Sequence, residues 1–164
     1  MQEFKVDFVK RSLDILNQYE GEYPFSNLIN CTLGLVLLPF EKGDNVEVWG
    51  KLISDVEVLK DVQINIFEPK LFNIIQPKSL NNFLKRMRHG FAHQNIIPIN
   101  ENKEFVKIQI INEYRKVIDL DVTFTREQLR DFALFIANTY LKSHDLKEKL
   151  LTLAKDSPKV ETVN

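Results

Sequence analysis

Two arginines and two histidines lie within eight residues of one another, at Arg86, Arg88, His89 and His93. Histidine moves protons near neutral pH, and arginine binds phosphate oxygens through a planar, permanently charged group. A proton carrier and a fixed cation are the two groups that phosphodiester chemistry needs from a protein. The cluster therefore predicts that this part of the chain acts on a phosphodiester.

The flanking residues predict that a helix carries the cluster. Ser79 is suited to cap the start of this helix. Helical spacing of the apolar residues predicts one buried face and places the Arg/His set on the opposite face; the apolar stripe is Leu80, Phe83, Leu84, Met87 and Phe91. On an ideal helix Arg88 and His93 point about 140° apart. They converge only if the helix ends or bends near Gly90, or if two chains meet at a two-fold axis.

The first part of the chain predicts two helices and a long connection. Residues 3–20 and 25–38 carry helical patterns, and the second of these is apolar nearly all round. Such a helix belongs in the centre of a bundle or against a partner subunit. Residues 41–79 are predicted to form an elaborated connection, with a turn at Gly43-Asp44-Asn45 and short helices around 51–60 and 69–75.

A β-hairpin follows the cluster. Residues 106–110 and 118–124 alternate between apolar and polar side chains, and polar residues 112–116 are predicted to join the two strands. Thr125 and Gln128 then have the spacing of a capping box, which predicts the start of a last long helix. In the hairpin itself, Asp119 and Asp121 are expected to face solvent.

These elements together predict a mainly α fold, a bundle of about four main helices with one β-hairpin inserted before the last long helix. We expect a single domain over residues 1–156, with one more short helix over 145–155. Residues 157–164 are expected to form a disordered tail.

Composition limits the class of protein. The chain has 164 residues, 44% hydrophobic and 27% charged, which is typical of a soluble globular protein. Its net charge of −1 disfavours a protein that coats duplex nucleic acid by charge alone. Cys31 is the only cysteine, and we expect neither a signal peptide, because residues 1–7 are too charged, nor a membrane span, because the most apolar run is too short. We therefore expect a cytoplasmic location.

The stretch Arg88-His89-Gly90-Phe91-Ala92-His93-Gln94-Asn95-Ile96 resembles the signature of the HEPN superfamily (higher eukaryotes and prokaryotes nucleotide-binding domains). In that signature an Arg and a following polar residue precede a His after four to six intervening positions, and here four residues separate Arg88 from His93. Arg86 fits the longer spacing. The apolar second helix ending in Leu37-Leu38-Pro39, and the order of elements over about residues 5–142, resemble a plasmid- and phage-defence-associated HEPN subgroup.

The resemblance implies a metal-independent endoribonuclease, a toxin or defence effector that needs no cofactor. Two copies would share one cleft, and cleavage would leave a 2′,3′-cyclic phosphate. The resemblance implies that His93 is the general acid/base and that Arg88 binds the scissile phosphate. It implies that His89 orients His93 or contacts RNA, that Arg86 holds a flanking phosphate, and that Asn95 also binds the substrate. RNA, a second copy of the chain and an antitoxin or operon-encoded protein are the partners that it implies.

Other interpretations of the same residues remain open. Arg86 and Arg88 could be solvated charges on an outer helix face, and His89 could cap the helix end. His89 and His93 have a spacing that binds metals, but no third ligand accompanies them, so no metal site is expected. The main alternative function is a non-catalytic HEPN module for dimerisation, protein interaction or RNA binding. A pocket for a small molecule or nucleotide within the bundle is a further alternative.

Overall fold

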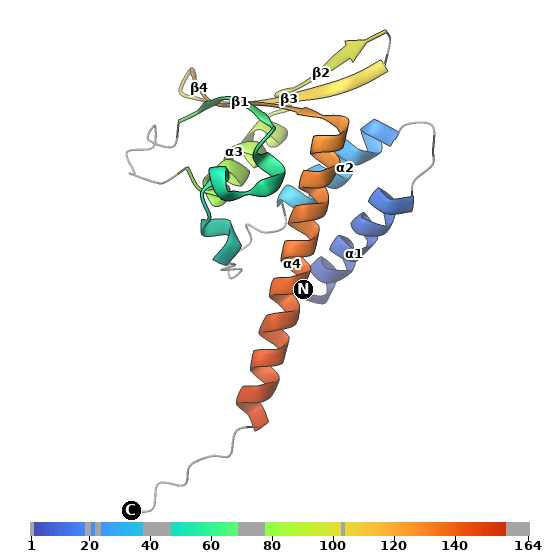
Figure 1. Ribbon diagram of the computed structural model, residues 1–164, viewed down its shortest axis with the longest axis vertical. Helices are drawn as coiled ribbons and strands as arrows, with labels where there is room; N and C mark the ends of the chain where they lie inside the picture. Colours follow the sequence, from blue (N-terminus) through green and yellow to red (C-terminus); the bar gives the residue numbers. More distant parts are fainter. Residues whose placement is uncertain are drawn as a thin grey trace, which may run out of the picture.

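Four antiparallel strands form one sheet, and the four α-helices of the described residues lie on one face of it (Figure 1). A computed structural model describes residues 2–18, 21, 24–37, 47–68, 78–102 and 104–156. The strand order is β1-β4-β3-β2, with every neighbouring pair antiparallel. The strands are β1 (Gln63–Phe67), β2 (Ile96–Glu101), β3 (Glu104–Tyr114) and β4 (Val117–Thr125). No described element covers the opposite face of the sheet (Figure 1).

This architecture is mixed α/β, so the prediction of a mainly helical bundle with one inserted hairpin is wrong. The predicted hairpin exists as β3 and β4, but β1 pairs with β4 and β2 pairs with β3 on its two outer sides. Both added strands are edge strands with weak sequence patterns. β1 is five residues long with an irregularity between Ile64 and Ile66, and β2 contains Pro98.

Three of the predicted helices are confirmed. They are α1 (Gln2–Gln18), α2 (Pro24–Leu37) and α3 (Leu80–Ala92), the helix of the Arg/His cluster. The last helix, α4 (Arg126–Asp156), is continuous, so the separate short helix expected over 145–155 is part of it.

The capping box at the start of α4 is also confirmed. The backbone N–H of Gln128 donates to Thr125 Oγ1 at 3.2 Å, and the backbone N–H of Thr125 donates to Gln128 Oε1 at 2.9 Å. These two bonds satisfy N–H groups that have no partner within the helix.

The described part of the connection before α3 contains three 3₁₀ helices, two of which lie in the region around 51–60 where short helices were expected. They are η2 (Glu47–Gly50), η3 (Ile53–Asp55) and η4 (Glu57–Leu59). The turn expected at Gly43-Asp44-Asn45, the helix expected around 69–75 and the tail expected over 157–164 lie outside the described residues.

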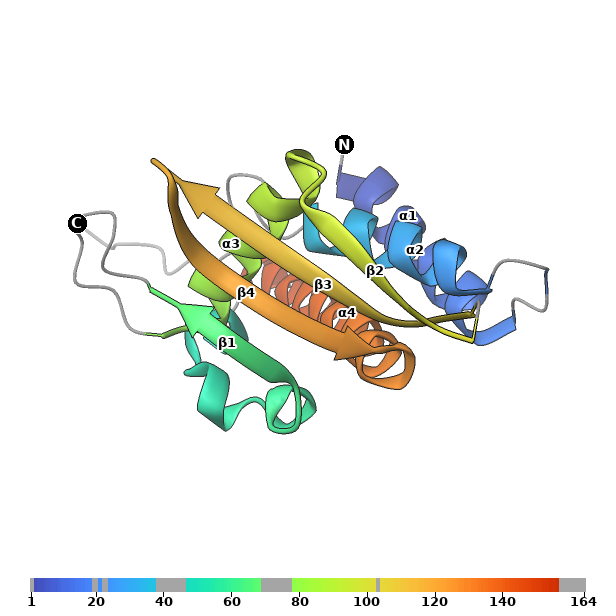
Figure 2. The same ribbon diagram turned by 90° about the horizontal axis from the view of Figure 1, so that it is seen from above.

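The hydrophobic core lies between the sheet and the helices. Seen from above, α3 and α4 pass beneath β3 and β4 (Figure 2). Phe132 of α4 is fully buried and packs against Phe83 of α3 and Phe124 of β4, with ring centroids 5.9 and 5.4 Å apart. The apolar helix α2 packs against α1, α3 and α4 of its own chain, so its composition needs no partner subunit.

Candidate functional site

Helix α3 presents the Arg/His cluster at its C-terminal end. Its start is capped as predicted, because Ser79 Oγ accepts from the backbone N–H of Asn82 at 3.3 Å. At the other end Asn95 N–H donates to the Gly90 carbonyl at 2.9 Å, and Gln94 N–H donates to the Phe91 carbonyl at 3.1 Å. These two bonds form a Schellman motif. Gln94 occupies its left-handed position, with φ of 57°.

Gly90 lies inside α3 and does not end it. A Cβ at this position would lie 2.7 Å from the Ile111 carbonyl oxygen, so glycine lets the helix approach β3 closely. Just after the helix, the carbonyl of Asn95 accepts a hydrogen bond from the backbone N–H of Ile111 at 3.0 Å. The helix end is therefore attached to the sheet by close packing at Gly90 and by this hydrogen bond.

Three residues of the predicted site are exposed to solvent. Arg88, His89 and His93 have exposed side chains, and Asn95 is half-buried. Because α3 is regular through Ala92, the bend that could bring Arg88 toward His93 within one chain is absent. The two side chains thus start about 140° apart around the helix axis.

Arg86 is buried, which contradicts both its assignment to a flanking RNA phosphate and its interpretation as a solvated charge. The residue is 4% exposed. Its Nε donates to Asp119 Oδ2 at 3.1 Å, and its terminal nitrogens donate to the carbonyls of Asn82 and Glu68 at 3.2 and 3.4 Å. The guanidinium also lies over the Phe67 ring, 5.3 Å from its centroid. Arg86 and Arg88 point about 160° apart on a helix, which explains why one is buried when the other is exposed.

Asp119 is fully buried, so the expectation that it faces solvent is wrong. The β3–β4 register shifts between Asn112 and Glu113, where Asn112 pairs with Leu120 and Glu113 pairs with Ile118. Asp119 is the extra residue of this β-bulge, and a bulge re-aims a side chain relative to strict alternation. Its second oxygen accepts from the Asn112 amide. Both carboxylate oxygens therefore have partners inside the protein.

The environment of Arg86 affects its protonation. Burial lowers the pKa of the Arg86 guanidinium, and the charge and hydrogen bond of Asp119 act in the opposite direction. An arginine starts from so high a pKa that it stays charged near neutral pH. No sequence pattern indicates this network, because Asp119 follows an alternating strand pattern and Asn112 falls within the predicted loop.

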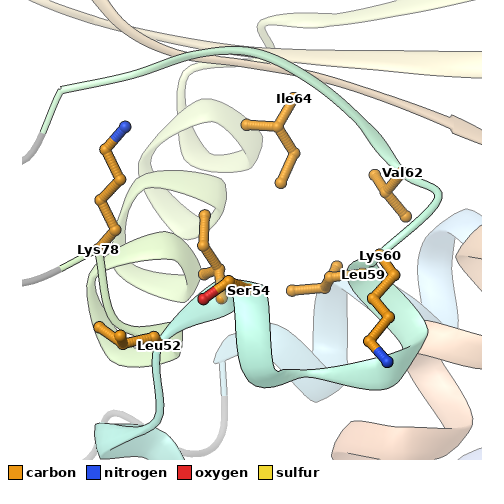
Figure 3. Close-up of a pocket in the computed structure, with 8 residues that line it drawn as sticks. Leu52, Ser54, Leu59, Lys60, Val62, Ile64 and Lys78 are labelled. Atoms are coloured by element: carbon orange, nitrogen blue, oxygen red, sulfur yellow. The ribbon is translucent and has the colours of Figure 1, made fainter.

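A pocket of about 710 Å³ lies at the opposite end of α3 from His93 (Figure 3). Residues of η3, η4 and β1 line it, together with Lys78 just before the helix cap. The 13 residues of α3 span about 18 Å at the usual helical rise. The pocket is therefore separate from the Arg/His cluster, and its described lining is mostly aliphatic with Ser54, Lys60 and Lys78 as the polar members.

Neither a metal cluster nor a membrane-spanning helix occurs in the described part of the chain. Within it, no three His, Cys, Asp or Glu side chains are grouped closely enough to hold a metal ion. No helix there has the length and apolar character needed to cross a membrane.

A family model described as HEPN pEK499 p136 matches residues 1–147. The chain belongs to this HEPN family. The match covers all four strands and most of α4, as well as the helix that carries Arg88 and His93. In this HEPN protein the mixed α/β architecture is therefore the setting of the Arg/His cluster. No curated protein and no solved structure gives a significant match to the chain.

Proposed function

We propose that this HEPN protein is a metal-independent endoribonuclease whose active site forms between two copies of the chain. The observation that carries the proposal is the exposure of Arg88 and His93 at the end of one rigid helix. A cation and a proton carrier are thus accessible to a large substrate such as RNA. The burial of Arg86 leaves Arg88 as the arginine of the motif that can reach it.

The geometry of α3 supports a shared site. Within one chain Arg88 and His93 diverge around the helix axis, so a single copy does not enclose a phosphate between them. A second copy related by a two-fold axis would place its own His93 opposite the first. The apolar character of α2 no longer supports a dimer, because the same chain covers that helix. The proposal therefore depends on the geometry of the motif helix.

The reaction uses the RNA itself as nucleophile. His93 of one copy accepts the proton of a 2′-hydroxyl, whose oxygen forms a bond to the adjacent phosphorus. The bond from phosphorus to the 5′-oxygen breaks, and the leaving oxygen takes a proton from the equivalent histidine of the second copy. Arg88 stabilises the charge that develops on the phosphoryl oxygens. The products are a 2′,3′-cyclic phosphate and a free 5′-hydroxyl.

His89 and Asn95 complete the proposed substrate-binding set, since both lie beside His93 and neither is fully buried. The HEPN resemblance supports a biological role as a toxin or phage-defence effector of the cytoplasm. An antitoxin or operon-encoded protein would then restrain the nuclease.

Cleavage of RNA in the presence of EDTA tests the proposal. The wild-type protein should cleave and leave cyclic phosphate ends, and His93→Ala should lower the rate by about 10²–10⁴-fold. His144→Ala is a matched control, because it removes a histidine from α4 without touching the cluster. Equal rates for wild type and His93→Ala would overturn the assignment. Light scattering at micromolar concentration should show a dimer, and a monomer that cleaves RNA would contradict the shared site.

A non-catalytic HEPN module for dimerisation, protein interaction or RNA binding is the second candidate. The net charge of −1 favours its dimerisation and protein-interaction forms, since a protein that binds RNA over a broad surface is usually basic. The same assay separates the two candidates: folded, dimeric wild-type protein that cleaves no RNA supports the module.

A further inference from the structure

The tip of the β3–β4 hairpin is a strained two-residue loop. β3 ends at Tyr114 and β4 begins at Val117, so the loop is Arg115 and Lys116 alone, shorter than the predicted loop over 112–116. Their φ values are 51° and 65°. Positive φ at both positions is the requirement of a type I′ turn, which Asn and Gly satisfy with least strain. Two long basic side chains are an unfavourable choice here, and retained backbone strain points to function.

The side chains at this tip form a basic and aromatic surface. The Arg115 guanidinium lies over the Tyr114 ring, with Cζ 5.2 Å from the ring centroid. Both residues and Lys116 are exposed. An exposed ring stacked with a guanidinium offers a flat surface to an unpaired base, and a neighbouring lysine can bind a phosphate. Glu113 adds one exposed carboxylate, on the residue before Tyr114 in the strand.

The register of the sheet places this tip beyond the proposed active site. β2 pairs with β3 only as far as Ile110, and the backbone of Ile111 is hydrogen-bonded to Asn95 at the end of α3. Tyr114 is three residues further along β3, a distance of about 10 Å in an extended strand. A single RNA strand passing His93 can therefore reach the tip.

We propose that Tyr114, Arg115 and Lys116 form an RNA-binding element that grips unpaired nucleotides next to the cleavage point. This inference rests on the proposed function for the identity of the ligand, and it narrows the substrate class to single-stranded RNA. A base stacks against the Tyr114–Arg115 pair, and Lys116 binds a neighbouring phosphate. Duplex RNA cannot use the stacking surface, because its bases are already stacked and paired.

The test measures binding of a labelled single-stranded oligoribonucleotide to His93→Ala protein, in which cleavage is removed. Arg115→Asn with Lys116→Gly installs the sequence that a type I′ turn favours, so the protein should melt at the same or a higher temperature. Because this variant can neither complete the base stack nor bind the phosphate, its Kd should be roughly tenfold higher or more. The slope of log K against log salt should fall by about 0.7 for each phosphate that the variant no longer binds.

A matched control removes the same charge elsewhere. Lys147→Ala with Lys149→Ala takes two exposed lysines from α4 and should leave both Kd and the salt slope nearly unchanged. Equal rises of Kd in the two double variants, or an unchanged Kd in the tip variant, would overturn the proposal. Absence of RNA binding, or equal binding of a duplex, would do so as well. If the wild-type protein cleaves no RNA but its RNA binding still depends on the tip, the RNA-binding proposal stands. The proposed nuclease function is then wrong.

Discussion

Arg86 and Asp119 form an ion pair in the core, with Nε and Oδ2 3.1 Å apart and neither side chain more than 5% exposed. The pair joins α3 to β4, and its two residues lie 33 positions apart in the sequence. It is surrounded by further donors and acceptors, so each charge is satisfied by hydrogen bonds as well as by its partner. Its role is to fix the helix of the Arg/His cluster on the sheet.

Removing one member of this pair should strongly destabilise the protein. Arg86→Ala or Asp119→Ala leaves a buried charge without its partner, which typically costs about 3–5 kcal/mol of unfolding free energy. Arg88→Ala is the matched control on the same helix; as an exposed change it should alter stability by no more than about 0.5 kcal/mol. Chemical denaturation measures all three variants. A destabilisation below about 1 kcal/mol for Arg86→Ala would show that the core tolerates an unpaired Asp119.

Gly90→Ala should destabilise the protein although alanine is the better helix former. The added Cβ would lie 2.7 Å from the Ile111 carbonyl oxygen and 3.0 Å from Ile110 Cγ2. Displacing backbone in this way typically costs about 1–3 kcal/mol, more than the gain of about 1 kcal/mol in helix propensity. Thermal or urea unfolding checks the sign. At Gly50 an added Cβ meets nothing within 4 Å, so Gly50→Ala should be neutral or slightly stabilising.

Gln94→Gly should stabilise the end of α3. Gln94 has φ of 57° in the Schellman motif, a conformation that costs a side-chain-bearing residue about 1–2 kcal/mol. Glycine removes this strain but loses more chain entropy on folding, so we expect a net gain of about 0.5–1 kcal/mol. Gln94→Val should have the opposite effect, because a β-branched residue is least compatible with this backbone. Equal stability of the two variants in urea unfolding would contradict the left-handed conformation of residue 94 in the Schellman motif.

Cys31 should make stability depend on alkaline pH. Burial raises the pKa of the Cys31 thiol above its ordinary value of 9.0. The unfolded chain then ionises at lower pH than the folded protein, so the stabilising contribution is complete below pH 9.0 and is lost as the pH rises through the folded-state pKa. Unfolding free energies measured from about pH 8 to about pH 10 should fall more for wild type than for Cys31→Ala. Parallel curves would show that the thiol is accessible to solvent in the folded protein.

Strong periodic patterns made individual helices and the central hairpin predictable, but not the fold class. Helices α1, α2 and α3, the capping box at Thr125 and the central hairpin were all expected, because each pattern repeats at a helical or strand period. The two edge strands were not predicted. The sequence of β2 does not alternate regularly between apolar and polar residues, and none of its residues is fully buried. Its pairing with β3 also depends on where α3 ends.

The roles of the site residues stay predictions, and the structure bears only on which of these residues are exposed. Arg88, His89 and His93 are exposed as their residue types suggested. The prediction for Arg86 was wrong because a carboxylate 33 positions away decides its burial. That carboxylate reaches the helix through a bulge, and a single-residue shift in strand register leaves no signature in a sequence read by alternation.

The two outermost strands also limit how copies of the protein can assemble. Pro98 gives β2 a position without an amide hydrogen, and the irregularity between Ile64 and Ile66 interrupts β1. An incoming strand needs an unbroken row of donors and acceptors, so neither border of the sheet is a good template for continuing it. Growth into open-ended fibres through the sheet is therefore disfavoured. The proposed pairing of two copies through the motif helix α3 uses neither border of the sheet.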